Sequence, residues 1–245
     1  MRSDGTFVVL FSNWYWWTSG DLNTYSKWQC VTVSSSGSWG SPVDISSYQV
    51  AAGAPGPIQG NLAIDSADTA HFVFPLQGTG YVHVSLTASG ALSGTTTIAA
   101  VGNLYNAVIA NISGVESLLI AANPTPLHGV YSTPISAISF TFTAGLTAEE
   151  VQWLAANGNT VYASSPQSGT GGGGWDDIVQ TPLIDLAWGT PETIESGAEL
   201  WGNWTSNRTS AEIGYVIENW NDFTPWFLRY PVASGQGPAC RYYAM

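Results

Sequence analysis

Five segments of the chain share one local pattern: a tight turn, an alternating apolar strand, a second strand, and a Gly/Ser turn before a Thr/Ser-rich third strand. The pattern recurs about every 45 to 50 residues, which is the period of a β-propeller blade. An isolated sheet of three or four strands cannot bury both of its faces, whereas sheets stacked around an axis cover one another. The repeat therefore predicts an all-β fold, a five-bladed β-propeller.

The predicted blades fill the whole chain as one domain, residues 1–245. Their approximate bounds are 1–47, 59–100, 101–148, 149–196 and 197–245. A β-sandwich or jelly roll is the alternative, because such folds also give short strands separated by Gly, Pro and Asn turns. Helix-length periodicity is confined to Thr147–Ala156, which fits an inner strand about as well.

Ring closure follows from the first unit, which begins directly at its Asp4–Phe11 hairpin strand. The C-terminal segment 240–245 is therefore expected to supply a strand to that unit. Cys30 and Cys240 would then lie close enough for a disulfide, which would stabilise the closed ring. Two separate buried thiols are the alternative.

The charge balance restricts the partners. Seventeen acidic and five basic residues give a formal net charge of −12, and Lys and Arg form no cluster. Nucleic acid and anionic membranes are therefore poor partners. No apolar run approaches about 18 residues, so no membrane insertion is expected. A surface rich in hydroxyls and amides, with 9% charged residues, is typical of secreted or virion-surface proteins that bind neutral ligands.

Tryptophan carries the functional signal, because aromatic rings stack on the apolar faces of sugars while nearby amides bond the hydroxyls. Trp28, Trp39, Trp188 and Trp201 lie in apolar strand contexts and are expected in the core. The run from Asn13 to Thr18 must expose at least two aromatic residues, and two later tryptophans are flanked by Asn. The predicted ligand-binding residues are Asn13, Trp14, Trp16, Trp17, Asn203, Trp204, Asn219 and Trp220.

Catalytic and metal-binding patterns are weak. His71 and His83 are expected to face each other across a hairpin, without the Cys, His or Glu spacing of a zinc site. The chain has no nucleophile elbow, phosphate loop or dinucleotide fingerprint. A pair of carboxylates would be needed for glycoside hydrolysis, and Asp65, Glu116, Glu150 and Glu199 are the candidates. We expect no catalytic residue, no cofactor and no metal, with a propeller glycosidase as an alternative.

The turn sequences resemble those of known propellers. Asp4-Gly5-Thr6-Phe7 and Gly37-Ser38-Trp39-Gly40-Ser41-Pro42 are similar to the hairpins of sialidase-like and related lectin propellers, and five units of this size resemble the five-bladed tachylectin-type lectins. The Asp-box order of the sialidase-like propellers is half present, at Ser3–Phe7. A sialidase requires an arginine triad, and the arginines here lie at Arg2, Arg208, Arg229 and Arg241, none in an equivalent blade position. The resemblance therefore implies binding without sialidase activity.

These observations predict a non-enzymatic adhesion module that binds a glycan or a glycosylated receptor, outside the cell or on a virion surface such as a tail fibre. The alternative is a structural virion or assembly protein, whose Trp-rich surface contacts other subunits.

Overall fold

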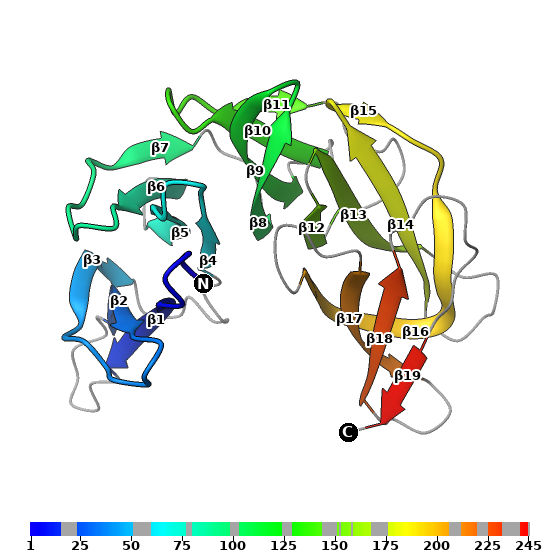
Figure 1. Ribbon diagram of the computed structural model, residues 1–245, viewed down its shortest axis with the longest axis horizontal. Coiled ribbons are helices and arrows are strands. Elements are labelled where there is room, and N and C mark those ends of the chain that lie inside the picture. Colours follow the sequence, from blue (N-terminus) through cyan, green and yellow to red (C-terminus); the bar gives the residue numbers. More distant parts are fainter. Residues whose placement is uncertain are drawn as a thin grey trace. The chain divides into compact units, whose positions relative to one another are not determined.

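The computed structural model shows an all-β protein, whose described residues form nineteen strands joined by turns (Figure 1). The structure describes residues 1–15, 24–50, 60–76, 80–98, 103–123, 129–143, 151, 153–157, 159–167, 176–205, 212–219, 225–231 and 241–244, with side chains for part of these ranges up to residue 193. A helix long and apolar enough for a membrane span does not occur in this described part. The chain divides into two compact units, Met1–Val101 and Gly102–Met245.

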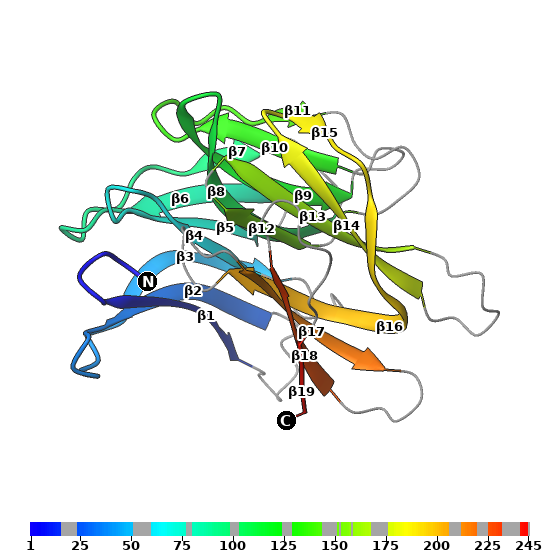
Figure 2. The same ribbon diagram turned by 45° about the vertical axis from the view of Figure 1, so that its right-hand side comes forward.

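The first unit contains two antiparallel sheets, each with its strands in chain order. The first sheet consists of β1 (Phe7–Tyr15), β2 (Thr24–Val33) and β3 (Val43–Val50). The second sheet consists of β4 (Asn61–Ile64), β5 (Ala70–Leu76), β6 (Gly80–Leu86) and β7 (Thr96–Ile98). Figure 2 shows the strands of both sheets following one another as up-and-down hairpins.

The two sheets are repeats of each other, because equivalent turns make the same hydrogen bonds. Ahead of β1, the Arg2 N–H donates to the Thr6 carbonyl over 2.8 Å, and ahead of β5, the Asp65 N–H donates to the Thr69 carbonyl over 3.0 Å. Strands β1, β2 and β3 therefore correspond to β5, β6 and β7. A counterpart of β4 is not found among the described strands of the first sheet.

The core of the first unit lies between these two sheets. Successive residues of a strand point to opposite faces, so one face of β1 and β2 meets one face of β5 and β6. Trp28 is 3% exposed, and its ring centroid lies 5.5 Å from that of Phe74. The buried members of this core are Val8, Trp28, Cys30, Ala70, Phe72, Phe74, Val82, Val84 and Leu86.

Entry of the chain into β4 requires a glycine. A Cβ atom on Gly60 would lie 2.5 Å from Cζ3 of Trp28 and 2.9 Å from Cδ2 of Leu10. These distances are shorter than van der Waals contact, so the glycine permits β4 to approach the first sheet.

The second unit also contains two antiparallel sheets. The third sheet of the chain consists of β8 (Asn103–Ile112), β9 (Val115–Asn123), β10 (Gly129–Pro134) and β11 (Thr141–Thr143). The fourth consists of β12 (Trp153–Asn157), β13 (Thr160–Gln167), β14 (Asp176–Ile184), β15 (Ala187–Trp188), β16 (Glu192–Thr205), β17 (Glu212–Asn219), β18 (Pro225–Pro231) and β19 (Arg241–Ala244). Their shared core comprises Ala110, Ile112, Leu119, Ala121, Val130, Val151, Leu154, Val161, Ala163 and Leu183.

Strand β16 runs through the predicted boundary between the fourth and the fifth unit. Its N-terminal part, up to Ala198, pairs with β14, and its C-terminal part, from Ala198 on, pairs with β17. The expected boundary at residues 196 and 197 therefore falls inside one 14-residue strand.

The C-terminal strand lies in the fourth sheet. In β19, Arg241 pairs with Arg229 and Ala244 with Trp226, both of β18. Strands that are neighbours in the chain usually pair with each other, and this pairing follows that tendency. The described partner of β19 is β18, and the expectation that segment 240–245 completes the first sheet stays a prediction.

Candidate functional site

The first unit presents two equivalent turns, residues 34–38 between β2 and β3 and residues 87–91 between β6 and β7. In the first, the Ser34 N–H donates to the Ser38 carbonyl over 2.9 Å; in the second, the Thr87 N–H donates to the Ala91 carbonyl over 3.0 Å. Gly37 (φ 84°) and Gly90 (φ 90°) occupy the left-handed position of each turn, which favours glycine. The two turns therefore share the same backbone hydrogen bonds and differ in side chains.

Hydroxyl groups line the first of these turns. The Oγ atoms of Ser34 and Ser36 lie 2.8 Å apart, and those of Ser36 and Ser38 lie 3.4 Å apart. The Ser34 Oγ also accepts a hydrogen bond from the Ser38 N–H over 3.0 Å. Each hydroxyl has one donor hydrogen and two acceptor lone pairs, so this exposed chain retains capacity for a polar ligand.

Trp39 follows this turn and is 69% exposed. Its backbone pairs with Val33, whereas the core side of β2 is formed by Trp28 and Cys30, which are in the opposite phase of the strand. Trp39 therefore lies on the side of the first sheet away from the core. The prediction that Trp39 is a core residue is wrong, and the same prediction is confirmed for Trp28.

The two remaining tryptophans expected in the core lie in the second unit. Trp188 is partly buried and packs against that unit's core, as predicted. Trp201 is a residue of β16, and its side chain lies outside the described set.

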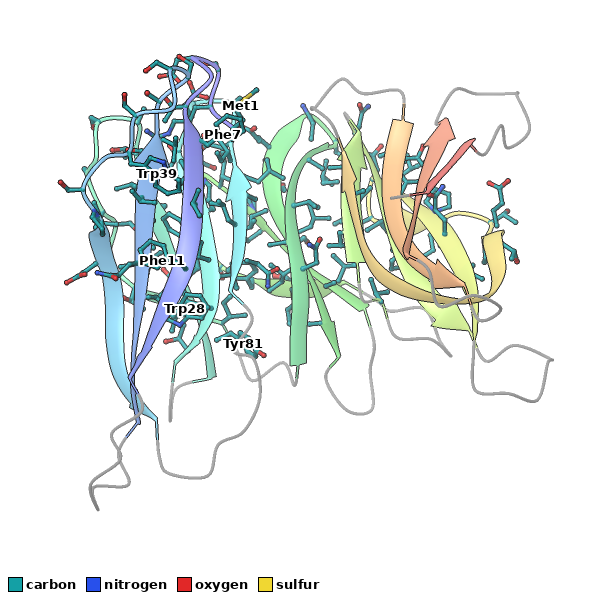
Figure 3. All side chains as sticks on the ribbon, turned by 90° about the horizontal axis from the view of Figure 1, so that it is seen from below. Met1, Phe7, Phe11, Trp28, Trp39 and Tyr81 are labelled. Carbon is teal, nitrogen blue, oxygen red and sulfur yellow. The ribbon has the colours of Figure 1, made fainter. Side chains whose placement is uncertain are left out.

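An apolar face of the first sheet surrounds Trp39. Phe7 pairs with Val33, and Val33 with Trp39, so these three residues form one row across the sheet. Phe7 is 50% and Val9 is 37% exposed. Figure 3 shows Phe7, Trp39 and Met1 near one end of the sheet and Phe11 farther along it. We call Phe7, Val9, Val33 and Trp39 the outer face of the first sheet.

The equivalent face of the second sheet is a packing face. Ala70 and Phe72, the counterparts of Phe7 and Val9, are fully buried, and Leu86, the counterpart of Val33, is 3% exposed. These three residues pack against the first sheet as part of the core of the first unit. Leu92, the counterpart of Trp39, is 41% exposed. In the second sheet, the position equivalent to Trp39 is therefore exposed although the rest of the equivalent face is buried.

A buried polar chain links β5 and β6. His71 Nδ1 lies 3.0 Å from His83 Nε2, and His71 Nε2 lies 3.1 Å from Asp65 Oδ2. All three side chains are buried, and the two rings stack with centroids 5.2 Å apart. The predicted pairing of the two histidines across a hairpin is confirmed. The sequence reasoning missed Asp65 as the third member of this chain.

The chain of contacts fixes the roles of the nitrogen atoms when both imidazoles are neutral. When Asp65 Oδ2 accepts from His71 Nε2–H, His71 Nδ1 is left to accept from His83 Nε2–H. Burial, and secondarily the neighbouring His71, lower the pKa of His83 from 6.5 to about 4. His83 is therefore neutral at pH 7.

The other carboxylate oxygen of Asp65 accepts hydrogen bonds within the turn that contains this residue. Oδ1 accepts the N–H groups of Ala67 and Thr69 over 2.9 and 2.8 Å. The other described carboxylates of the predicted set lie on two different strands. Glu116 is a partly buried residue of β9, Glu199 is a residue of β16, and Glu150 lies outside the described residues. Within the described part of the chain, no group of three His, Cys, Asp or Glu side chains is arranged to hold a metal ion.

Carboxylates also connect turns of different sheets within each unit. Asp68 accepts the Ser3 N–H over 2.7 Å and the Ser3 hydroxyl, and Asp185 accepts the Ser113 N–H over 2.7 Å. The guanidinium of Arg2 donates to the Thr87 carbonyl over 3.0 Å. In the first unit, these contacts hold the turn at residues 2–6, which lies against Ser35 of the turn that precedes Trp39.

The first group of predicted ligand-binding residues falls in β1 or just after it. Asn13 and Trp14 are residues of β1, where position 14 is in phase with Val8 and Leu10, and position 13 with Val9. Trp16 and Trp17 lie outside the described residues.

The second group is divided by its strands. Asn203 and Trp204 pair with Tyr215 and Gly214, near one end of the β16–β17 pair, whereas Asn219 pairs with Ala198 at the other end. Asn219 lies five positions after Gly214 along β17, which corresponds to about 17 Å of extended strand. The structure therefore does not bring Trp204 and Asn219 together.

The last predicted ligand-binding residue, Trp220, lies outside the described residues, as does Cys240 of the predicted disulfide. Cys30 is buried in the core of the first unit, and burial raises the pKa of its thiol. The disulfide between Cys30 and Cys240 stays a prediction.

The sequence matches no protein-family model and no curated protein. The fold is similar to that of the lectin BP39L from Burkholderia pseudomallei, with a TM-score of 0.52 and 14% identity over 96% of this chain and 71% of that one. It is also similar to the β-propeller domain of Cps50 (Swd1) from Myceliophteria thermophila, with a TM-score of 0.53 and 9% identity over 95% of this chain and 73% of that one. Together with the repeated antiparallel sheets, these likenesses show a β-propeller fold.

Proposed function

We propose that this protein is a non-enzymatic carbohydrate-binding module, which attaches a secreted or virion-surface protein to a glycan or a glycosylated receptor. The proposal rests on the surface chemistry of the first unit, on the charge of the chain and on the fold. One of the two propellers compared above is a lectin, and that comparison supports the proposal at the level of fold.

The exposed indole of Trp39 is the observation that carries the proposal. An aromatic side chain at 69% exposure exposes apolar area to water, whereas Trp28 of the same sheet is 3% exposed. It directly follows a turn lined by three serine hydroxyls. Sugar sites commonly combine an aromatic platform with a small number of placed polar groups.

The negative charge of the chain determines whether charged or neutral ligands are favoured. A net charge of −12 repels anionic partners and does not oppose a neutral one. We therefore expect neutral glycans to bind in preference to sialylated or sulfated glycans.

A glycan array tests this function. The fluorescently labelled chain is applied to neutral and acidic glycans, and a heat-unfolded sample of the same labelled chain is the control. Binding of the folded chain to a restricted set of neutral glycans is the expected result. Absence of signal above the unfolded control on every glycan would contradict the proposed function.

Contact with other protein subunits is the second candidate function, and the outer face of the first sheet favours it. Phe7 and Val9 are exposed, although their counterparts in the second sheet are buried by packing. Such a face suits a second protein surface. A mass measurement across a range of concentrations tests it: a chain that associates, and loses association on Phe7→Ser, supports this function.

A further inference from the structure

We propose that Trp39 and the hydroxyl-lined turn 34–38 form a binding site for a neutral pyranose, in which the indole stacks on the apolar face of the sugar ring. The inference rests on the carbohydrate-binding function proposed above. It assigns that function to a turn of the first sheet, where the sequence pattern predicts a core tryptophan.

The fold keeps this position open. Leu92, the counterpart of Trp39, is 41% exposed, although Leu86, the residue with which it pairs, is 3% exposed. A sheet packed on the outer face would therefore cover Val33 and still leave the position of Trp39 accessible. The exposure of Trp39 is a property of the turn and does not depend on what covers the rest of the face.

The turn fixes the backbone of Trp39 before any ligand arrives. Trp39 pairs with Val33, and the next residue, Gly40, donates its N–H to the Thr32 carbonyl over 2.8 Å. A Cβ on Gly40 would lie 2.9 Å from Thr32 Oγ1, so a glycine is needed for this close approach. A backbone fixed in advance lowers the entropic cost of binding.

The polar groups are fixed in the same way. Ser34 accepts the Ser38 N–H and contacts Ser36, and Ser36 in turn contacts Ser38. This chain of hydroxyls lies within five residues of the indole and is exposed to solvent. Hydroxyl groups both donate and accept, which matches the hydroxyl groups at the edge of a sugar ring.

The tryptophan is not required by the turn. The second turn has the same backbone hydrogen bonds and a matching contact of 2.9 Å between Thr87 Oγ1 and Ser89 Oγ, and it carries leucine at position 92. A leucine therefore satisfies the structural requirements of this position. The large exposed aromatic ring at position 39 is an addition to the repeat, and ligand contact accounts for it.

Fluorine NMR of the chain labelled with 5-fluorotryptophan tests the site. The chain has 12 tryptophans, and the resonance that is lost in Trp39→Leu belongs to Trp39. The probes are the methyl glycosides of glucose, galactose, mannose, fucose and N-acetylglucosamine, together with methyl sialoside as an acidic control. We expect at least one neutral glycoside to shift the Trp39 resonance, and the sialoside to leave it in place.

Three variants sharpen the test. Trp39→Leu gives the first turn the residue of the second, and should weaken binding by at least tenfold, as expected for the loss of a central contact. Trp39→Phe keeps an aromatic ring and should retain part of the affinity. Leu92→Trp places an indole on the equivalent turn, and should add a new resonance that responds to the same glycoside.

The possible outcomes distinguish a failure of the proposed site from a failure of the proposed function. If a glycoside shifts other tryptophan resonances and Trp39→Leu binds as well as the native chain, carbohydrate binding stands and the site is wrong. If no glycoside shifts any resonance and the glycan array is also blank, the proposed function fails. If Trp39→Leu lowers the thermal midpoint by many degrees while binding is unchanged, Trp39 is a packing residue and the site is overturned. If the Trp39 resonance responds only to protein concentration, it contacts another subunit, and the site is likewise overturned.

Discussion

Folding stability should depend on pH through the buried side chain of His83. The pKa of His83 is lowered from 6.5 to about 4, chiefly by burial, because the imidazole is removed from water. Below pH 6.5 the unfolded chain takes up a proton that the folded chain resists. The stabilising effect is therefore complete above about pH 6.5, and it is lost as the pH falls toward 4. A shift of this size corresponds to about 3 kcal/mol.

Urea unfolding between pH 4 and pH 7.5 measures this effect as the change in the free energy of unfolding. The control is His83→Gln, which keeps a polar side chain and cannot titrate. The native chain should lose about 3 kcal/mol more than the variant between pH 6.5 and pH 4. An equal pH dependence in the two proteins would show that His83 titrates normally in the folded state, and would refute the argument from burial.

Three further perturbations test the packing of the first unit. Gly60→Ala forces a Cβ against Trp28 and should cost about 1 to 3 kcal/mol in unfolding experiments, whereas Gly94→Ala, which has nothing within 4 Å of its Cβ, should change stability little. Asp65→Ala leaves the N–H groups of Ala67 and Thr69 without their acceptor and should cost about 1 to 3 kcal/mol; a midpoint equal to that of the native chain would contradict the role of Asp65 in the turn. Cys30 should react with a maleimide slowly in the folded chain and rapidly in urea, because its thiol is buried; rapid labelling without urea would place it at the surface.

The repeat of the first unit was predictable because its signals are local. Turns of the types seen at Gly5 and Gly37 need a residue with positive φ, and glycine marks them in the sequence. Alternation of apolar residues then indicates the strands between them. Within the segment 147–156, whose periodicity fits a helix or an inner strand, residues 153–156 belong to strand β12, and Leu154 is buried in the core of the second unit.

The exposure of Trp39 was not predictable from its apolar surroundings. The alternation of side chains between the two faces of a strand cannot be followed through a turn of unknown geometry. The face on which Trp39 lies is therefore known only from its pairing with Val33. The link between Asp65 and His71 was hidden for a similar reason, since it depends on the turn that folds Asp65 back onto β5. The 14-residue strand β16 also conceals the boundary between two predicted units, because one strand pairs with both of its neighbours.

Isothermal titration of the full chain with the neutral glycan that gives the strongest array signal tests carbohydrate binding most directly. We predict a saturable heat of binding that persists in high salt, because the ligand is uncharged and salt screens only charge interactions. A sialylated form of the same glycan should bind more weakly to this acidic chain. Titrations that show only the heat of dilution for every neutral glycan, with the chain folded, would contradict the account.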